Sequence, residues 1–151
     1  NGAKVVATPP ALSLTQNHEM QLTRNGRTTL LAPNGKNVRY IWPSLSPDGT
    51  KVLYYVSGVG CFVCDLNGNN VKPMGQLRAA KWYDNATIVG MNDKDNGEYV
   101  TSSSIVAKSL SGAEQTLTSE DIIAQYPRVS PSARKIAFET PAGEAYIINL
   151  K

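Results

Sequence analysis

Residues 92–99 hold several oxygen-bearing side chains around one glycine. Asp93, Asp95 and Glu98 surround Gly97, and alternating carboxylates around a glycine resemble part of a calcium-binding loop, in which oxygen atoms enclose a hard cation. The full pattern of such a loop is missing. A solvated turn between two strands is the alternative that we favour, so we expect no metal here and no cofactor in the chain.

The two cysteines, Cys61 and Cys64, form a CxxC pattern, which is also found in metal sites and redox-active disulfides. We place both on one strand, where residues three apart point to opposite faces and lie about 10 Å apart along the chain. A disulfide needs Cα atoms within about 7 Å of each other, and zinc needs ligands that no second CxxC or histidine pair supplies. The pattern therefore predicts two buried free thiols.

The sequence carries no recognisable set of residues for hydrolytic catalysis. Its one histidine is His18, and the Gly-x-Ser-x-Gly motif that presents a nucleophilic serine is missing. Asp65 and Glu139 are the strand-borne candidates for the paired carboxylates, about 5–10 Å apart, of a glycosidase. Nothing in the pattern brings these two together, so we expect a protein that is not an enzyme and rank a glycosidase last.

An internal repeat indicates the elements that hold these residues. Residues 43–55 (PSLSPDGTKVLYY) read against residues 127–139 (PRVSPSARKIAFE), 84 positions later, with matching proline, serine and lysine positions. Turn pairs at 25–26, 67–68 and 111–112 are spaced by 42 and 44 residues. A period of about 40–45 residues with four short strands per unit is typical of β-propeller blades. The sequence thus predicts an all-β fold, a partial ring of three to four four-stranded blades.

The chain is expected to be a single propeller arc with blades at about 3–34, 35–75, 76–119 and 120–151, the first and last incomplete. Residues 4–8 are either the first strand of the first blade or the missing fourth strand of the last. Residues 119–125 predict one or two helical turns capped by Ser119. The expected strands are 12–16, 19–24, 27–32, 40–45, 51–56, 61–66, 70–73, 79–83, 87–91, 104–110, 115–118, 127–130, 135–139 and 145–150.

Composition excludes several classes of partner. The 151 residues are 41% apolar and 18% charged, which is enough apolar material for one core. A net charge of +3 is too small to indicate nucleic-acid binding, and no apolar run is long enough to span a membrane. The chain begins at Asn1 instead of Met, so either a signal peptide has been removed or the sequence is a piece of a longer protein.

The repeated segments resemble a known family. Residues 46–54 (SPDGTKVLY) and 61–70 (CFVCDLNGNN) are similar to the TolB-like (WD-type) β-propeller repeat. Residues 129–138 and 145–150 also fit, except that Ser132-Ala133 replaces Asp-Gly, and the middle unit has lost its Ser-Pro. The resemblance covers about residues 12–151. It implies a propeller like that of TolB, a periplasmic protein that binds other envelope proteins, and hence a periplasmic or extracellular location in bacteria.

In such propellers, the loops between second and third strands share a rim with the loops between blades. On our blade assignment, one rim would gather a set of polar side chains that we expect to bind a ligand, because loops on a rigid scaffold commonly bind. The set is Asp93, Asp95, Glu98, His18, Arg39, Tyr40, Glu120 and Asp121.

An incomplete ring has a physical consequence, because each blade needs neighbours to cover its faces. We expect an arc to leave two large apolar faces open, and such faces rarely stay uncovered. A homodimer of half-propellers or the remainder of a longer chain would cover them. The expected function is a non-catalytic scaffold that binds a protein or glycan partner through one rim. The alternative is the gating propeller of a larger prolyl-oligopeptidase-like serine hydrolase whose catalytic domain lies outside this chain.

Overall fold

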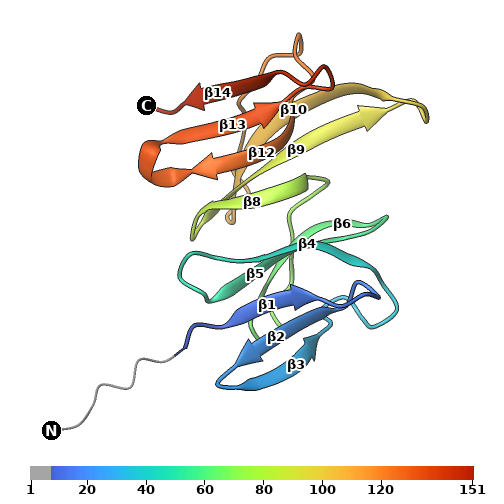
Figure 1. Ribbon diagram of the computed structural model, residues 1–151, viewed down its shortest axis with the longest axis vertical. Coiled ribbons are helices and arrows are strands. Elements are labelled where there is room, and N and C mark those ends of the chain that lie inside the picture. Colours follow the sequence, from blue (N-terminus) through green and yellow to red (C-terminus); the bar gives the residue numbers. More distant parts are fainter. Residues whose placement is uncertain (1–7) are drawn as a thin grey trace, which may run out of the picture.

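The computed structural model describes residues 8–151, which form four antiparallel β-sheets stacked in chain order (Figure 1). The first sheet contains β1 (Ala11–Leu14), β2 (Met20–Arg24) and β3 (Arg27–Leu31), and the second contains β4 (Tyr40–Leu45), β5 (Lys51–Val56), β6 (Gly60–Asp65) and β7 (Lys72–Pro73). The third contains β8 (Arg78–Asp84), β9 (Thr87–Asp95), β10 (Val100–Ser109) and β11 (Glu114–Thr116), and the fourth contains β12 (Gln125–Ser130), β13 (Lys135–Glu139) and β14 (Ala145–Asn149). Strands pair with their neighbours in sequence, so the predicted partial β-propeller is confirmed.

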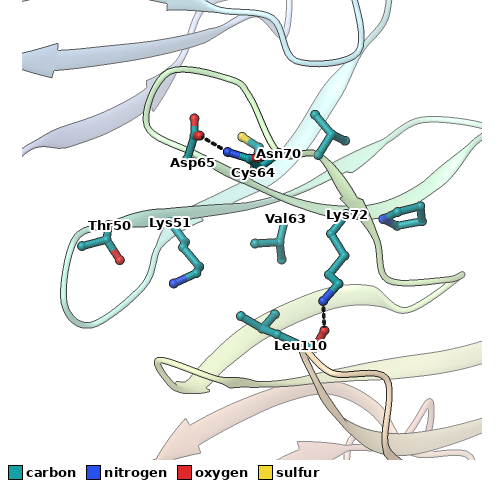
Figure 2. A pocket seen from close by; sticks show the side chains of 10 residues that line it. Thr50, Lys51, Val63, Cys64, Asp65, Asn70, Lys72 and Leu110 are labelled. Atoms are coloured by element: carbon teal, nitrogen blue, oxygen red, sulfur yellow. Dashed lines mark hydrogen bonds between the residues drawn. The ribbon is translucent and has the colours of Figure 1, made fainter.

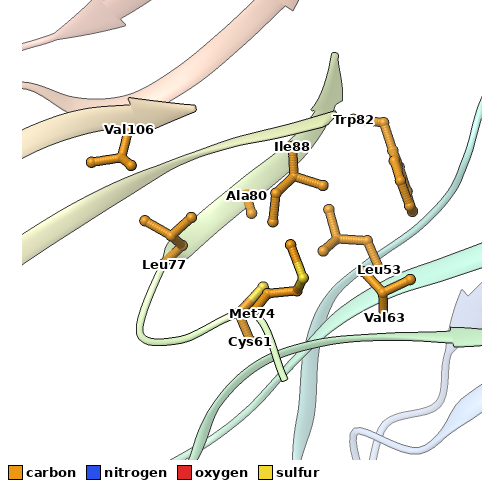
Figure 3. Packing of buried hydrophobic residues seen from close by; sticks show 9 residues of the cluster. All are labelled: Leu53, Cys61, Val63, Met74, Leu77, Ala80, Trp82, Ile88 and Val106. Atoms are coloured by element: carbon orange, nitrogen blue, oxygen red, sulfur yellow. The ribbon is translucent and has the colours of Figure 1, made fainter. Parts of the chain in front are cut away.

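Apolar side chains on both faces of the middle sheets join the stack. On β5, Val52 and Tyr54 pack toward the first sheet, whereas Leu53 packs toward the third. Figure 3 shows the second of these cores, where Leu53 and Val63 meet Ile88 of the third sheet. A further core joins the third and fourth sheets. Stability therefore comes from stacking, as in other repeat architectures.

The strands of the first sheet occupy the second, third and fourth positions of a blade. Pro10, directly before β1, lies against the turn between β4 and β5, where a Cβ atom on Gly49 would be 3.6 Å from it. Arg24, beside the β2–β3 turn, donates a hydrogen bond of 2.9 Å to Asn67 in the β6–β7 turn. β1 therefore corresponds to β5. The strand expected at residues 4–8 lies outside the described residues except for its last position, which belongs to no strand.

The first strands of the other three sheets are β4, β8 and β12; β8 contacts the other two, and together they form the inner edge of the arc. Each contains a bulge in which two residues oppose one residue of the next strand. The first bulged residue has a positive φ in all three: 51° at Trp42, 50° at Ala79 and 50° at Tyr126. Pro43 and Pro127 follow two of them, and a strand tolerates proline at an edge or a bulge because proline has no N–H to donate.

The repeated Ser-Pro turn takes two forms that differ by one residue. In the second sheet, Gly49 has a φ of 72° and donates its N–H to the carbonyl of Ser46 at 2.8 Å. In the fourth sheet, residues Pro131–Ala133 form a short 3₁₀ helix, and Arg134 has a φ of 52° and donates to the carbonyl of Pro131 at 3.1 Å. Because Asp-Gly is replaced, the left-handed conformation falls on a residue with a side chain, which is unfavourable.

Two local expectations are wrong. Residues 119–125 form no helix; they make a single turn, and Ile122 and Ala124 pack into the core between the third and fourth sheets. Residues 92–95 are not a loop but continue β9, because pairing with β10 extends beyond the apolar part of the hairpin. Within the described part of the chain, no helix is long and apolar enough to cross a membrane.

The outward face of the first sheet is polar, so the expectation of two large apolar open faces is wrong at this end. Ser13, Gln21, Thr23 and Thr28 alternate with the inward-facing residues and point away from the second sheet, together with Leu30. The hydroxyls of Thr23 and Thr28 are 2.7 Å apart. This face of the first sheet therefore exposes mainly polar side chains.

The outward face of the fourth sheet is mixed in character. Ala137 and Ile147 are paired across β13 and β14 in the way that Leu53 and Val63 are paired across β5 and β6. The pair in the second sheet is buried, whereas Ile147 is 61% exposed. Arg128 continues the row on β12. Only a narrow apolar strip is therefore open at this end.

Candidate binding site at the inner edge

The three bulges of the inner strands line one cavity of about 340 Å³. An extra residue in a strand bends it and re-aims its side chains, so residues far apart in the sequence meet at the inner edge. The lining residues come from the second, third and fourth sheets: Trp42, Ala79, Lys81, Tyr126, Pro127, Arg128 and Glu139.

Arg78, at the start of β8, packs against Trp42, which lines this cavity. Its guanidinium carbon lies 5.5 Å from the centroid of the Trp42 ring, within the range of a cation–π interaction. Its Nη1 is 3.0 Å from Oδ2 of Asp93, whose side chain is 6% exposed, against 40% for that of Arg78. The other carboxylate oxygen of Asp93 is buried without a hydrogen-bond partner. A buried anion therefore anchors a partly exposed cation against the ring.

The lining of the cavity is basic and aromatic. Lys81 and Arg128 are exposed cations, and Glu139 is the carboxylate among the lining residues. Tyr126 is 45% exposed. An aromatic surface beside ammonium and guanidinium groups is complementary to a partner that carries acidic groups and an apolar or planar surface.

The residues that the sequence assigned to one rim fall into separate groups. His18 and Arg39 meet, with 2.8 Å between Nε2 of the histidine and Nη2 of the arginine. Tyr40 is not a surface residue, and its place in the expected site is corrected: it is 2% exposed, and its hydroxyl donates to the carbonyl of Gly35 at 2.7 Å. Burial raises the pKa of this hydroxyl. The side chain points into the core because it lies on an inward-facing position of β4.

The five carboxylates of the expected site are dispersed. Asp93 is buried on β9, and Asp95 accepts a hydrogen bond of 2.9 Å from the backbone of its own turn. Glu98 is exposed in the β9–β10 turn, and Glu120 and Asp121 are exposed between β11 and β12. Within residues 8–151, no group of three His, Cys, Asp or Glu side chains is placed to hold a metal ion.

Cys61 and Cys64 are buried free thiols, as the strand placement predicted. Burial raises the pKa of each thiol to about 12. The thiolate is the nucleophile and the metal ligand, so burial disfavours the reactive form of both cysteines near neutral pH.

The two carboxylates considered for a glycosidase lie on different sheets. Asp65 ends β6, and its carboxylate accepts a hydrogen bond of 2.9 Å from the N–H of Asn69, which lowers its pKa. Glu139 lies on β13 and lines the inner cavity. The structure does not bring them into one site.

Sequence reasoning missed the inner cavity, although part of the signal was present. Trp42-Pro43 and Tyr126-Pro127 each place an aromatic residue before a proline inside a strand, and proline there indicates a bulge. Ala79 carries no such signal, and the burial of Asp93 depends on contacts with another strand.

Comparisons with known proteins give matches among solved structures. The chain is similar to the TolB protein of Acinetobacter baumannii, with a TM-score of 0.59, 20% identity, and coverage of 91% of this chain and 39% of that one. A second match is the putative TolB of Agrobacterium tumefaciens, with a TM-score of 0.57, 17% identity, and coverage of 91% and 56%. The fold is that of a TolB-like β-propeller.

A third structure similar to this TolB-like chain is an oligogalacturonate lyase in complex with manganese, with a TM-score of 0.57, 15% identity, and coverage of 87% of this chain and 40% of that one. No protein-family model and no curated protein matches the sequence. The chain spans between 39% and 56% of the length of these three structures. At these identities, the likenesses establish the fold alone.

Proposed function

We propose that this chain is a non-catalytic TolB-like propeller scaffold that binds a protein or glycan partner at the inner-edge cavity and the adjoining rim. The observation that carries the proposal is the convergence of three bulges, which places Trp42, Tyr126, Lys81 and Arg128 around one cavity. The rigid sheets set the spacing of these side chains, and their charge favours an acidic partner. The His18–Arg39 pair would contribute from the rim.

The likeness to TolB supports a periplasmic or extracellular location, which we include in the proposal. The likeness to a lyase named for an acidic oligosaccharide supports an acidic glycan as one form of the partner. Lyase activity is not part of the proposal, because a likeness at 15% identity supports the fold alone. We also propose that a second copy, or the remainder of a longer chain, continues the arc beyond the strip around Ile147. Sedimentation of the chain over a range of concentrations tests the second copy.

Site-specific photo-crosslinking tests the binding site. The photoreactive residue p-benzoylphenylalanine replaces Tyr126 in the full chain, or replaces Tyr99, which is 64% exposed near the tip of the β9–β10 hairpin, as the matched control. After irradiation with an extract of the source cells, we expect a discrete adduct at position 126 that Arg128→Glu removes. Equal labelling at positions 126 and 99, or adducts that survive Arg128→Glu, would contradict the proposal.

A further inference from the structure

We propose that the groove between the outer parts of the second and third sheets binds a single-chain amphiphile with an anionic head group. This groove is separate from the inner-edge cavity and has a volume of about 740 Å³. Figure 2 shows its walls, which come from β5, β6 and β7 on one side and from the turn after β10, with Leu110, on the other.

The pairing of the strands puts apolar and cationic side chains on one face of the groove. Val63 pairs with Leu53 on β5 and with Lys72 on β7, so these three side chains share the face that points to the third sheet. Lys51 is two residues before Leu53 and shares that face as well. Val63 therefore lies between two lysines, with Leu110 opposite (Figure 2).

The cations of this groove have no carboxylate partner among the described residues. Lys72 donates from the second sheet to the carbonyl of Leu110, and Lys108 donates from the third sheet to the carbonyl of Met74 at 3.4 Å. The two lysines thus cross the same gap in opposite directions, and each bonds to a neutral oxygen. An anion entering the groove would meet the ammonium groups of Lys51 and Lys72, which line it.

Asp65 also borders the groove, but its carboxylate is hydrogen-bonded to residues of its own turn. Its oxygens accept hydrogen bonds from the backbones of Asn67 and Asn69 and from the side chain of Asn70, at 2.8–2.9 Å. Figure 2 shows Asp65 and Asn70 on the side of the strands away from the lysine side chains. Asp65 is the cross-strand partner of Lys51, but its carboxylate stabilises its own turn and forms no ion pair with the lysines of the groove.

An amphiphile would contact the apolar side chains of the groove with its tail and the lysine ammonium groups with its head group. Burying successive methylene groups against Val63, Pro73 and Leu110 is favourable in proportion to the apolar area removed from water. A carboxylate or phosphate head at the mouth would form charge-assisted hydrogen bonds with the lysines. A cationic amphiphile has the same apolar area but would be repelled, so charge decides between ligands with equal tails.

Calorimetric titration of the full chain tests this inference. The probes are decanoate, decyltrimethylammonium and inorganic phosphate, with the two amphiphiles kept below the concentrations at which they form micelles. We expect saturable binding of one decanoate per chain and no binding of the cation or of phosphate alone. The inference is overturned if the cation binds as tightly as decanoate, or if phosphate does.

Variants locate the site. Lys51→Glu should weaken decanoate binding about tenfold, because it places a negative charge beside the head group. Lys36→Glu makes the same charge change on an exposed loop residue outside the groove and should have no effect. Leu110→Asp should abolish binding, and thermal unfolding confirms that each variant is folded. Decanoate binding that is unchanged in both Lys51→Glu and Leu110→Asp would contradict the proposed site.

Discussion

Cys61 and Cys64, three residues apart on β6, point into different apolar cores: Cys61 into the core shared with the third sheet, and Cys64 into the core shared with the first. Both thiols are 2% exposed, and burial raises the pKa of each to about 12. We expect neither to react with a thiol reagent at pH 8 in the folded protein. Absorbance with Ellman's reagent measures this, and the protein unfolded in guanidinium provides the control in which both thiols react at once. Fast reaction of either thiol in the folded state would contradict the core placement.

Arg134→Gly should stabilise the protein. Arg134 is exposed with a φ of 52°, a conformation that a side chain disfavours, and glycine should recover about 0.5–1 kcal/mol of unfolding free energy there. Urea denaturation measures the change. Ala133→Gly is the matched control: Ala133 has no positive φ, so glycine there should be destabilising. The explanation fails if both variants shift the midpoint in the same direction.

Gly90→Ala should destabilise the third sheet by about 1–3 kcal/mol, because the added methyl group overpacks the core. A Cβ atom at this position would lie 3.0 Å from Cβ of Leu77 and 3.2 Å from Cβ of Ala80. Gly90 faces the bulge of β8, so little space is available for the neighbours to move. In a double-mutant cycle with Leu77→Gly, which removes the Cβ atom of that contact, part of the cost should be recovered. Additive effects would show that the contact with Leu77 is not the cause.

Asp48 should contribute to the loss of stability in acid. Hydrogen bonds from Ser46 and Thr50 lower its pKa from 3.8 to about 2. The unfolded chain therefore binds the proton more readily, and this contribution is fully present above pH 3.8 and is lost as the pH falls through about 2. Asp48→Asn should flatten the dependence of the urea midpoint on pH in this window. Parallel curves for the variant and the parent would contradict the assignment.

Removing either member of the Arg78–Asp93 pair should have unequal effects. The carboxylate is 6% exposed and the guanidinium 40%, so Arg78→Met leaves a buried charge without compensation, at a cost of about 3 kcal/mol. Asp93→Asn leaves a cation that water can reach and should cost about 1 kcal/mol. Urea denaturation at neutral pH measures the free energy of unfolding of both variants. Equal costs for Arg78→Met and Asp93→Asn would refute the argument from burial.

Strands next to the repeated Ser-Pro turns could be predicted from the sequence to the residue. β4, β5 and β13 coincide with the expected ranges 40–45, 51–56 and 135–139, because a short apolar run and the Ser-Pro turn that bounds it are local properties. β9 instead continues to Asp95, four residues beyond the expected end. Its last residues are polar and form part of no apolar run, so only pairing with β10 reveals the strand.

The sequence by itself determined the repeat, the all-β propeller architecture and the opposite orientation of the two cysteines, because a period of two along a strand fixes which residues share a face. The tertiary structure decided that Tyr40 and Asp93 are buried, that the face bearing Gln21 is polar and that the bulges meet in one cavity. These features depend on how each sheet packs against the next and on contacts between residues 15 to 84 positions apart in the sequence. The spacing of residues along one strand does not reveal such contacts, because the same strand can have its face covered by a neighbouring sheet or exposed to solvent.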